Sequence, residues 1–132
     1  PFGVASLIKE GTDVSIITYG AAVHWALETL EKYPHISADV IDLRTLQPLD
    51  FETILTSVKK TNKAIILQED SLFGSMASDI SSQLMEQAFE YLDAPVKRVA
   101  SIETPIPFAI ALEQQYLAKR TFDEDLLALL AY

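Results

Sequence analysis

This sequence has no cysteine, only four glycines and a single tryptophan in 132 residues. The lack of cysteine excludes disulfide bonds, thiolate metal sites and a cysteine nucleophile. No apolar run reaches the roughly 20 residues that a membrane-spanning helix needs, and the first residues do not have the pattern of a signal peptide. These absences predict a protein without a membrane segment, in the cytosol or in the lumen of an organelle.

Basic residues are also scarce. Nineteen acidic side chains face ten basic ones, which gives a net charge of −9. Such a surface repels a phosphate backbone, and no basic cluster offsets it, so nucleic acid is excluded as a partner. A positively charged protein partner would be attracted, although solubility alone is a sufficient reason for an acidic surface.

The length and the apolar content indicate one globular domain. Hydrophobic residues make up 49% of the 132 residues, enough for a core in a domain of ordinary size. The chain begins at Pro1 rather than at methionine, and a strand-like run follows within a few residues. We therefore expect residues 1–132 to form a single domain cut from a longer polypeptide.

Strand-like and helix-like segments alternate along the chain. The β-branched and apolar runs that predict strands are Val4–Glu10, Val14–Tyr19, Ala38–Leu43, Lys63–Glu69 and Val96–Ser101. Apolar residues at helical spacing predict helices over 20–33, Phe51–Lys60, Ser75–Leu92 and Pro107–Tyr116, and a last helix that a capping box from Thr121 to Glu124 would open.

This alternation predicts an α/β fold with three layers, α/β/α, around a five-stranded and mostly parallel sheet. The first two strands are joined only by Gly11-Thr12-Asp13, which is too short for a parallel crossover. One strand, the first, should therefore run antiparallel to the others. Glu28 and Lys32 are spaced to form an ion pair on the exposed face of their helix.

The stretch "DLRTLQPLD" (42–50) connects a predicted strand to a predicted helix. Pro48 cannot continue a strand ladder, and Asp50 is a strong N-cap for the helix that begins at Phe51. Arg44 follows the carboxyl end of a strand, where ligand sites of α/β sheets form. It could clamp an anion there, or hold the loop through backbone carbonyls or Asp42.

Three further residues are candidates for a site. His24, in the first turn of a helix, could shuttle protons or sense pH, or it could pack beside Trp25 at a subunit contact. Glu69 and Asp70 lie where a strand leads into the long helix, and such a pair could do acid–base work. The alternative for this segment is a plain turn in which Gly74 supplies backbone freedom and Ser75 caps the helix.

Several motifs together resemble one family. "GTDVSIITYGAAVH", "VIDLRTLQPLD", "SVKKTNKAIILQED" and "LDAPVKRVASIETPIPFA" follow one another as in the C-terminal domain of the β subunit of 2-oxo acid dehydrogenase E1 enzymes, of the pyruvate or branched-chain type. The resemblance runs from about Gly3 to Tyr116. It implies the transketolase C-terminal fold, which is the three-layer architecture predicted above.

The resemblance also implies a division of labour. The complete E1 enzyme uses thiamin diphosphate and Mg²⁺, held between an α subunit and the other domain of β, to decarboxylate a 2-oxo acid oxidatively and pass the acyl group to lipoyl-E2. This chain lacks the Gly-Asp-Gly and Asn-Asn cofactor motif. It is thus expected to hold no catalytic, cofactor or metal residue and to be inactive alone, with His24, Arg44, Glu69 and Asp70 at most bordering a shared site.

The partners implied are an E1 α subunit, a second β subunit and the basic peripheral-subunit-binding domain of E2. Asp123, Glu124 and Asp125, at the start of the acidic last helix, are candidate E2 contacts, while a solvated terminal helix is the other interpretation. A different class of function is also open. The chain could be a stand-alone small-ligand or regulatory binding module of the same fold.

Overall fold

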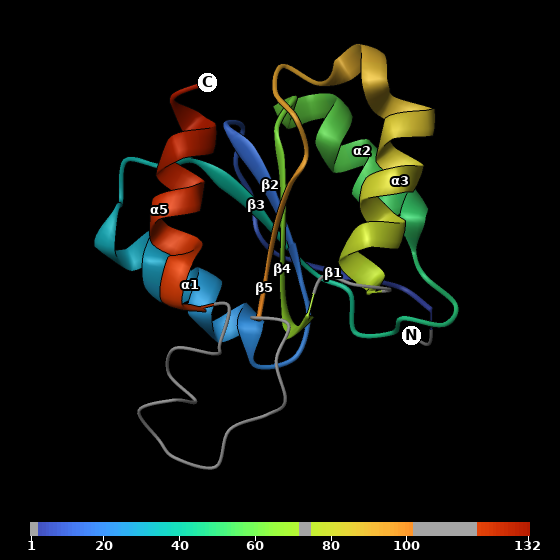
Figure 1. Ribbon diagram of the computed structural model, residues 1–132, viewed down its shortest axis with the longest axis horizontal. Coiled ribbons are helices and arrows are strands. Elements are labelled where there is room, and N and C mark those ends of the chain that lie inside the picture. Colours follow the sequence, from blue (N-terminus) through green and yellow to red (C-terminus); the bar gives the residue numbers. More distant parts are fainter. Residues whose placement is uncertain (1–2, 72–74, 102–118) are drawn as a thin grey trace.

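The computed structural model describes residues 3–71, 75–101 and 119–132, with the backbone alone for Asp70, Ser71 and Arg120 (Figure 1). The helix predicted over Pro107–Tyr116 lies outside these residues. Within them, no helix is both long enough and apolar enough to cross a lipid bilayer.

Five strands form one sheet in the order β1-β3-β2-β4-β5. Their bounds are Ser6–Lys9 for β1, Val14–Thr18 for β2, Ala38–Asp42 for β3, Ala64–Ser71 for β4 and Lys97–Ser101 for β5. β2, β3, β4 and β5 are parallel, and β1 pairs antiparallel with β3 at one edge. This confirms both the mostly parallel sheet and the direction of the first strand.

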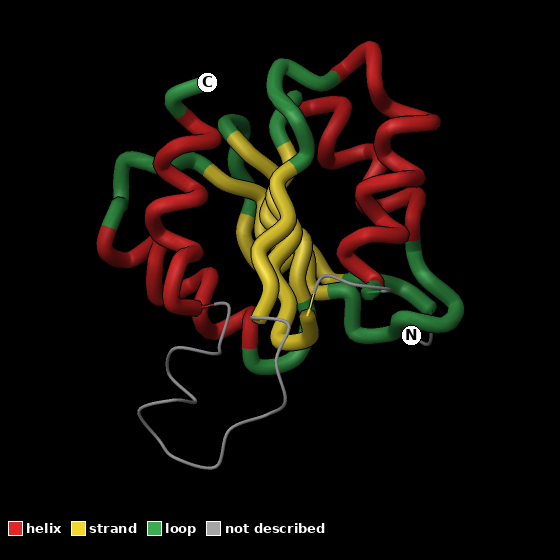
Figure 2. The backbone as a smooth tube through the Cα atoms, viewed as in Figure 1, coloured by secondary structure: helices red, strands yellow, loops and turns green. Residues whose placement is uncertain are grey.

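Helices cover both faces of the sheet, as Figures 1 and 2 show. α1 (Ala22–Lys32) and α5 (Lys119–Leu130) pack on one face; α2 (Phe51–Thr61) and α3 (Met76–Ala88) pack on the other. Neighbouring residues of β2 point to opposite faces, so Ile16 belongs to the core under α1 and α5, and Ile17 to the core under α2 and α3. The three-layer α/β/α prediction is therefore confirmed.

Side-chain caps fix where two of the helices begin. Asp50 accepts a hydrogen bond from the Thr53 N–H at 3.2 Å and caps α2, as predicted. Ser75 accepts from the Ser78 N–H and caps α3. At the other end of α2, Asn62 adopts a left-handed conformation with φ 65°, and its N–H donates to the Val58 carbonyl at 2.8 Å.

Several boundaries differ from those predicted, among them one end each of α5, α3 and β4. α5 begins at Lys119, so Thr121 lies inside the helix and the predicted capping box is wrong. α3 ends at Ala88, where a 3₁₀ turn η1 (Phe89–Tyr91) replaces the last predicted helical turn. β4 continues to Ser71, because Ser71 still pairs with Ser101 of β5 after an irregularity in the ladder.

Candidate functional site

The predicted site residues at the carboxyl edge of the sheet lie at separate strand and helix ends. Arg44 follows β3, His24 lies in the first turn of α1, and Glu69 lies in β4. Because β2 separates β3 from β4, the sheet keeps Arg44 and Glu69 apart. Among the described residues, no hydrogen bond or ion pair joins His24, Arg44 and Glu69, whose side chains are all exposed. The side chain of Asp70 lies outside the described part of the structure.

Arg44 makes local contacts to Asp42. Its backbone has a positive φ of 59°, and its N–H donates to Asp42 Oδ1 at 3.1 Å. The guanidinium Nε lies 4.0 Å from Asp42 Oδ2, and the arginine side chain is 54% exposed. The loop-holding alternative therefore has contacts in the structure. Whether Arg44 also contacts an anion remains a prediction.

The acidic residues of α5 differ in their surroundings. Asp123 accepts hydrogen bonds from the Thr29 hydroxyl and, at 2.6 Å, from the Lys32 ammonium of α1. Asp125 lies 3.7 Å from the Lys97 ammonium of β5, whereas Glu124 is exposed. Two of the three predicted docking acids thus already pair within the domain. Their contact with E2 remains a prediction.

These contacts replace the ion pair predicted between Glu28 and Lys32. Lys32 turns to Asp123, and Glu28 pairs with Lys119 at 3.0 Å between the carboxylate and the ammonium. Both residues of α1 are therefore engaged by α5. Partial burial raises the pKa of Asp123, but hydrogen bonds from Lys32 and Thr29 and the charge of Lys32 outweigh it, so the pKa is lowered overall.

A pH dependence follows from Asp123. Because folding lowers its pKa, the ionised carboxylate stabilises the fold above its unfolded pKa of about 4, and this contribution disappears as the pH falls through the lower folded value. Asp123→Asn should lower the free energy of unfolding by about 1 kcal/mol at pH 7. Urea unfolding at pH 7 and pH 2.5 should show the difference shrinking toward zero at the acidic pH; a difference that stays constant would contradict this role.

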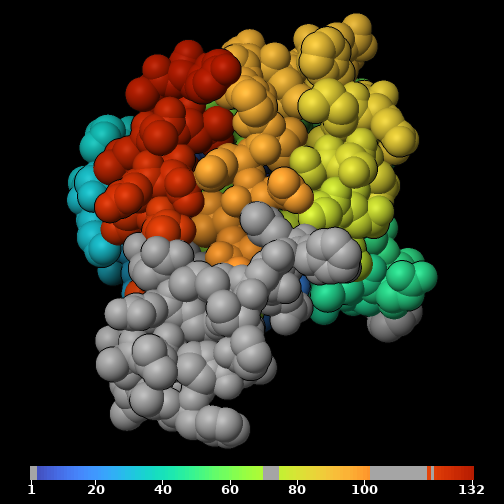
Figure 3. All heavy atoms as spheres, viewed as in Figure 1, coloured from blue at the N-terminus to red at the C-terminus, as the bar shows by residue number. Residues whose placement is uncertain are grey.

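An apolar surface lies where α5, η1 and β5 meet. Two hollows, of about 190 and 320 Å³, share Pro95 and Tyr132 in their walls. Phe89 and Tyr132 are 68% and 72% exposed, which is high for large aromatic side chains. We call the surface formed by Met85, Phe89, Leu92, Pro95 and Tyr132 the C-terminal apolar surface. In Figure 3 the red end of α5 lies against the orange and gold residues between η1 and β5.

Two acids line this surface, and the residue that ends α2 holds η1 in place beneath it. Asp93 and Asp125 line the hollows, and Lys97 near Asp125 is the one basic residue among the described lining residues. The Asn62 side chain donates to the Tyr91 carbonyl at 2.7 Å, and the Asn62 carbonyl accepts from the Asp93 N–H at 2.8 Å. These bonds fix η1 to α2, so Phe89 is presented on an anchored turn.

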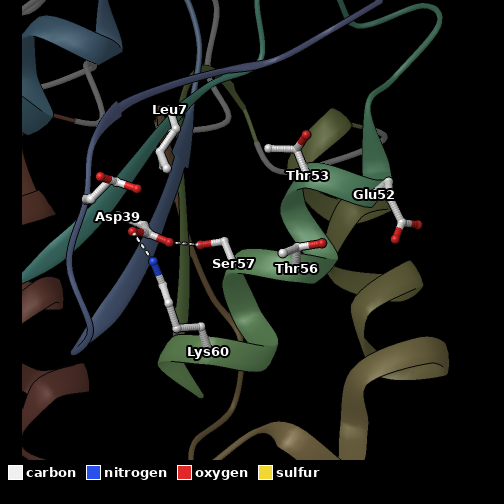
Figure 4. Close-up of a pocket in the computed structure, with 8 residues that line it drawn as sticks. Leu7, Asp39, Glu52, Thr53, Thr56, Ser57 and Lys60 are labelled. Carbon is white, nitrogen blue, oxygen red and sulfur yellow. Dashed lines mark hydrogen bonds and ion pairs between the residues drawn. The ribbon is translucent and has the colours of Figure 1, made fainter.

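A different hollow, of about 370 Å³, lies between β1 and α2 (Figure 4). Its Asp39 carboxylate is buried and accepts from the Gly11 N–H at 2.9 Å, the Ser57 hydroxyl at 2.6 Å and the Lys60 ammonium at 2.8 Å. Ser57 also contacts Ser15 at 2.6 Å between hydroxyl oxygens. Asp39 lies near the amino end of β3, away from the carboxyl edge where α/β ligand sites form. We interpret the cluster as a structural brace that joins the turn after β1 to β3 and α2.

Sequence reasoning did not find the C-terminal apolar surface or the Asp39 cluster. Phe89 was placed in a continuous helix, where an outward-facing aromatic side chain would have been the only signal. Asp39 stands in an apolar strand, and a lone acid in such a run is the signal that could have predicted a buried, paired carboxylate.

The structure is an α/β domain whose mostly parallel sheet has helices on both faces. Among its described residues, the candidate site residues do not come together in one catalytic cluster. The family model of the transketolase C-terminal domain matches residues 3–121, and the chain belongs to this family. It is 46% identical over 120 residues to the acetoin:2,6-dichlorophenolindophenol oxidoreductase subunit beta of Cupriavidus necator, covering 89% of this chain and 35% of that protein.

A second relative is the pyruvate dehydrogenase E1 component subunit beta of Rickettsia felis, 43% identical over 116 residues, which cover 86% of this chain and 36% of the relative. The chain thus spans about a third of the length of the curated relatives it matches. A solved split-gene transketolase, described as an inactive beta4 tetramer, superposes with a TM-score of 0.81 at 28% identity, covering 98% of this chain and 42% of that one.

Proposed function

We propose that this chain is the C-terminal domain of the β subunit of a thiamin-diphosphate-dependent E1 enzyme of a 2-oxo acid dehydrogenase complex. The complete enzyme would decarboxylate a 2-oxo acid oxidatively and transfer the acyl group to lipoyl-E2, in a bacterial cytoplasm or a mitochondrial matrix. The observation that carries the proposal is the 43% identity over 116 residues to a pyruvate dehydrogenase E1 β subunit. This similarity favours the proposal over a stand-alone ligand-binding module.

Thiamin diphosphate and Mg²⁺ would be bound by other parts of that enzyme. Two features of this chain support this. The sequence has no Gly-Asp-Gly or Asn-Asn motif, and the candidate residues at the carboxyl edge are held at separate strand ends rather than in one cluster. The domain would then contribute to assembly with an E1 α subunit and a second β subunit, while substrate choice resides elsewhere.

A chimaera tests this function. This chain would replace the matching third of the Rickettsia felis E1 β subunit, which would then be assembled with its own α subunit and E2. We expect the chimaera to oxidise pyruvate at a rate within about tenfold of the parent, and not acetoin, because the parent supplies the cofactor site. A chimaera that folds but does not join the α subunit would contradict the proposal.

The C-terminal apolar surface is the region that best fits a docking partner. Phe89 and Tyr132 offer exposed aromatic area beside the hollows. Asp93 adds negative charge to a hollow that has no basic residue among its described lining residues. Aromatic anchors next to pockets, with acids around them, suit a small basic domain. We propose that the peripheral-subunit-binding domain of E2 docks here, with Glu124 and the neighbouring acids of α5 at the rim.

Truncating Phe89 should weaken E2 docking strongly. Loss of a central aromatic anchor costs about 2 kcal/mol, or roughly 30-fold in affinity, so Phe89→Ala should raise the dissociation constant by about that factor in calorimetry with the E2 domain. Leu127→Ala is the matched control, because Leu127 is also exposed, at 37%, but does not line either hollow. Equal effects of the two substitutions would exclude this surface.

Charge reversal tests the acidic residues separately. Changing Asp123, Glu124 and Asp125 to lysine should weaken binding at low salt, with a smaller effect at high salt, since exposed charges are screened. Glu124→Lys alone should account for most of the change, because Asp123 and Asp125 already have partners in the domain. Binding that is indifferent to all three reversals would remove this helix start from the docking site.

A further inference from the structure

The segment that leads into β1 lies against the loop 43–50, although the two are far apart in sequence. The Ala5 N–H donates to Asp50 Oδ2 at 2.9 Å. Gly3 has a φ of +79°, and a Cβ added there would lie 3.1 Å from Pro48 Cγ. The polypeptide therefore passes close to both Pro48 and Asp50 before it joins the sheet.

The loop 43–50 is held by backbone contacts to β2 and within the loop. The Leu43 N–H donates to the Thr18 carbonyl of β2 at 2.9 Å, and the Phe51 N–H donates to the Leu49 carbonyl at 3.0 Å. Leu46 and Leu49 form an antiparallel bridge across the turn. A loop fixed at its start, at its end and across its middle offers a fixed surface to the segment that lies on it.

Asp50 does more than an N-cap requires. One oxygen, Oδ1, accepts from the Thr53 N–H at 3.2 Å and satisfies α2. The other, Oδ2, accepts from the Thr53 hydroxyl at 2.6 Å and from the Ala5 N–H. A serine N-cap would serve the helix equally well, but its single short hydroxyl has no second oxygen for Ala5. The choice of aspartate thus links the cap to the segment before β1.

We propose that the loop 43–50 is a seat that fixes the path by which the polypeptide enters this domain, with Asp50 as its positioning residue. In the proposed E1 β subunit, on which this consequence rests, the seat would set the direction from which the preceding part of the chain reaches the sheet. The seat itself is a property of this chain, so it can be tested without E1 or E2 partners.

A spin label tests the seat directly. The chain has no cysteine, so Val4→Cys, at a position that is 45% exposed, gives one labelled site. In Asp50→Ser the label should become at least threefold more mobile, while amide exchange at Thr53 stays within about threefold of the parent. An unchanged label mobility, or a label and a Thr53 amide that loosen together, would overturn the proposal.

Two controls separate the seat from general destabilisation. Thr53→Ala removes only the hydroxyl donor and should leave the label immobile, and a label at Glu124→Cys, on α5, should not respond to Asp50→Ser. Asp50→Asn is the milder variant if serine prevents folding. An asparagine has one amide oxygen, which in this geometry cannot accept from both the Ala5 and the Thr53 N–H groups. Either the label must therefore become more mobile or the Thr53 amide must exchange faster. If neither happens, the proposal is wrong, whether or not the chain belongs to an E1 enzyme.

Discussion

Asp39→Ala is expected to lower the free energy of unfolding by about 3 kcal/mol, because it removes a buried carboxylate that accepts from three donors. The Gly11 N–H and the Ser57 hydroxyl lose their acceptor, and Ser57 is itself buried with Ser15. Lys60 is 44% exposed and regains water, so its loss adds little. Urea unfolding at pH 7 measures the difference.

Two matched variants sharpen this result. Asp39→Asn keeps one acceptor oxygen and should cost about half as much. Asp42→Ala removes an acid from the other end of β3, where the carboxylate is only partly buried and binds the nearby Arg44, so it should cost less than about 1 kcal/mol. If Asp39→Ala and Asp42→Ala were equally mild, the Asp39 cluster would not be the brace that joins the turn after β1 to β3 and α2.

Gly11→Ala is the second substitution with a large expected effect. A Cβ at this position would lie 2.1 Å from the Ala38 nitrogen and 2.4 Å from the Ser37 carbonyl carbon. These are backbone atoms at the start of β3, which cannot rotate away, so the turn between β1 and β2 must move and its hydrogen bond to Asp39 must lengthen. We expect a loss of at least about 3 kcal/mol, seen as a large fall in melting temperature.

Gly20→Ala is the control for that substitution. Gly20 has a positive φ of +63°, but a Cβ there meets nothing within 4 Å. The penalty should therefore be only the roughly 1 kcal/mol of placing alanine in the left-handed region. Similar melting temperatures for the two variants would show that close contact with β3 is not the reason for glycine at position 11.

Features set by local chemistry were predictable from the sequence. The apolar runs located the strands, and Asp50 and Ser75 were recognised as caps, because these signals act over a few neighbouring residues. The antiparallel direction of β1 followed from the length of the connection between β1 and β2 alone, since the short turn at Gly11 cannot form a parallel crossover. The family resemblance, confirmed over residues 3–121, rested on motifs in the same local segments.

Features set by contacts between distant segments were not predictable. Local spacing paired Glu28 with Lys32, but α5 lies on α1 and engages both side chains with Lys119 and Asp123. The Thr121 cap failed because the helix continues two residues further toward the N-terminus. The C-terminal apolar surface depends on where α3 stops and on Tyr132 and Pro95 lining the same hollows, and neither is encoded in a periodic pattern.

In the proposed E1 β subunit, this domain would support assembly and leave cofactor chemistry to other parts of the enzyme. Isothermal titration of the 132-residue chain with thiamin diphosphate and Mg²⁺ tests it most directly. We predict heats no larger than those of dilution up to millimolar cofactor. A saturable heat with a micromolar dissociation constant would contradict the account, because it would place a cofactor site within this chain.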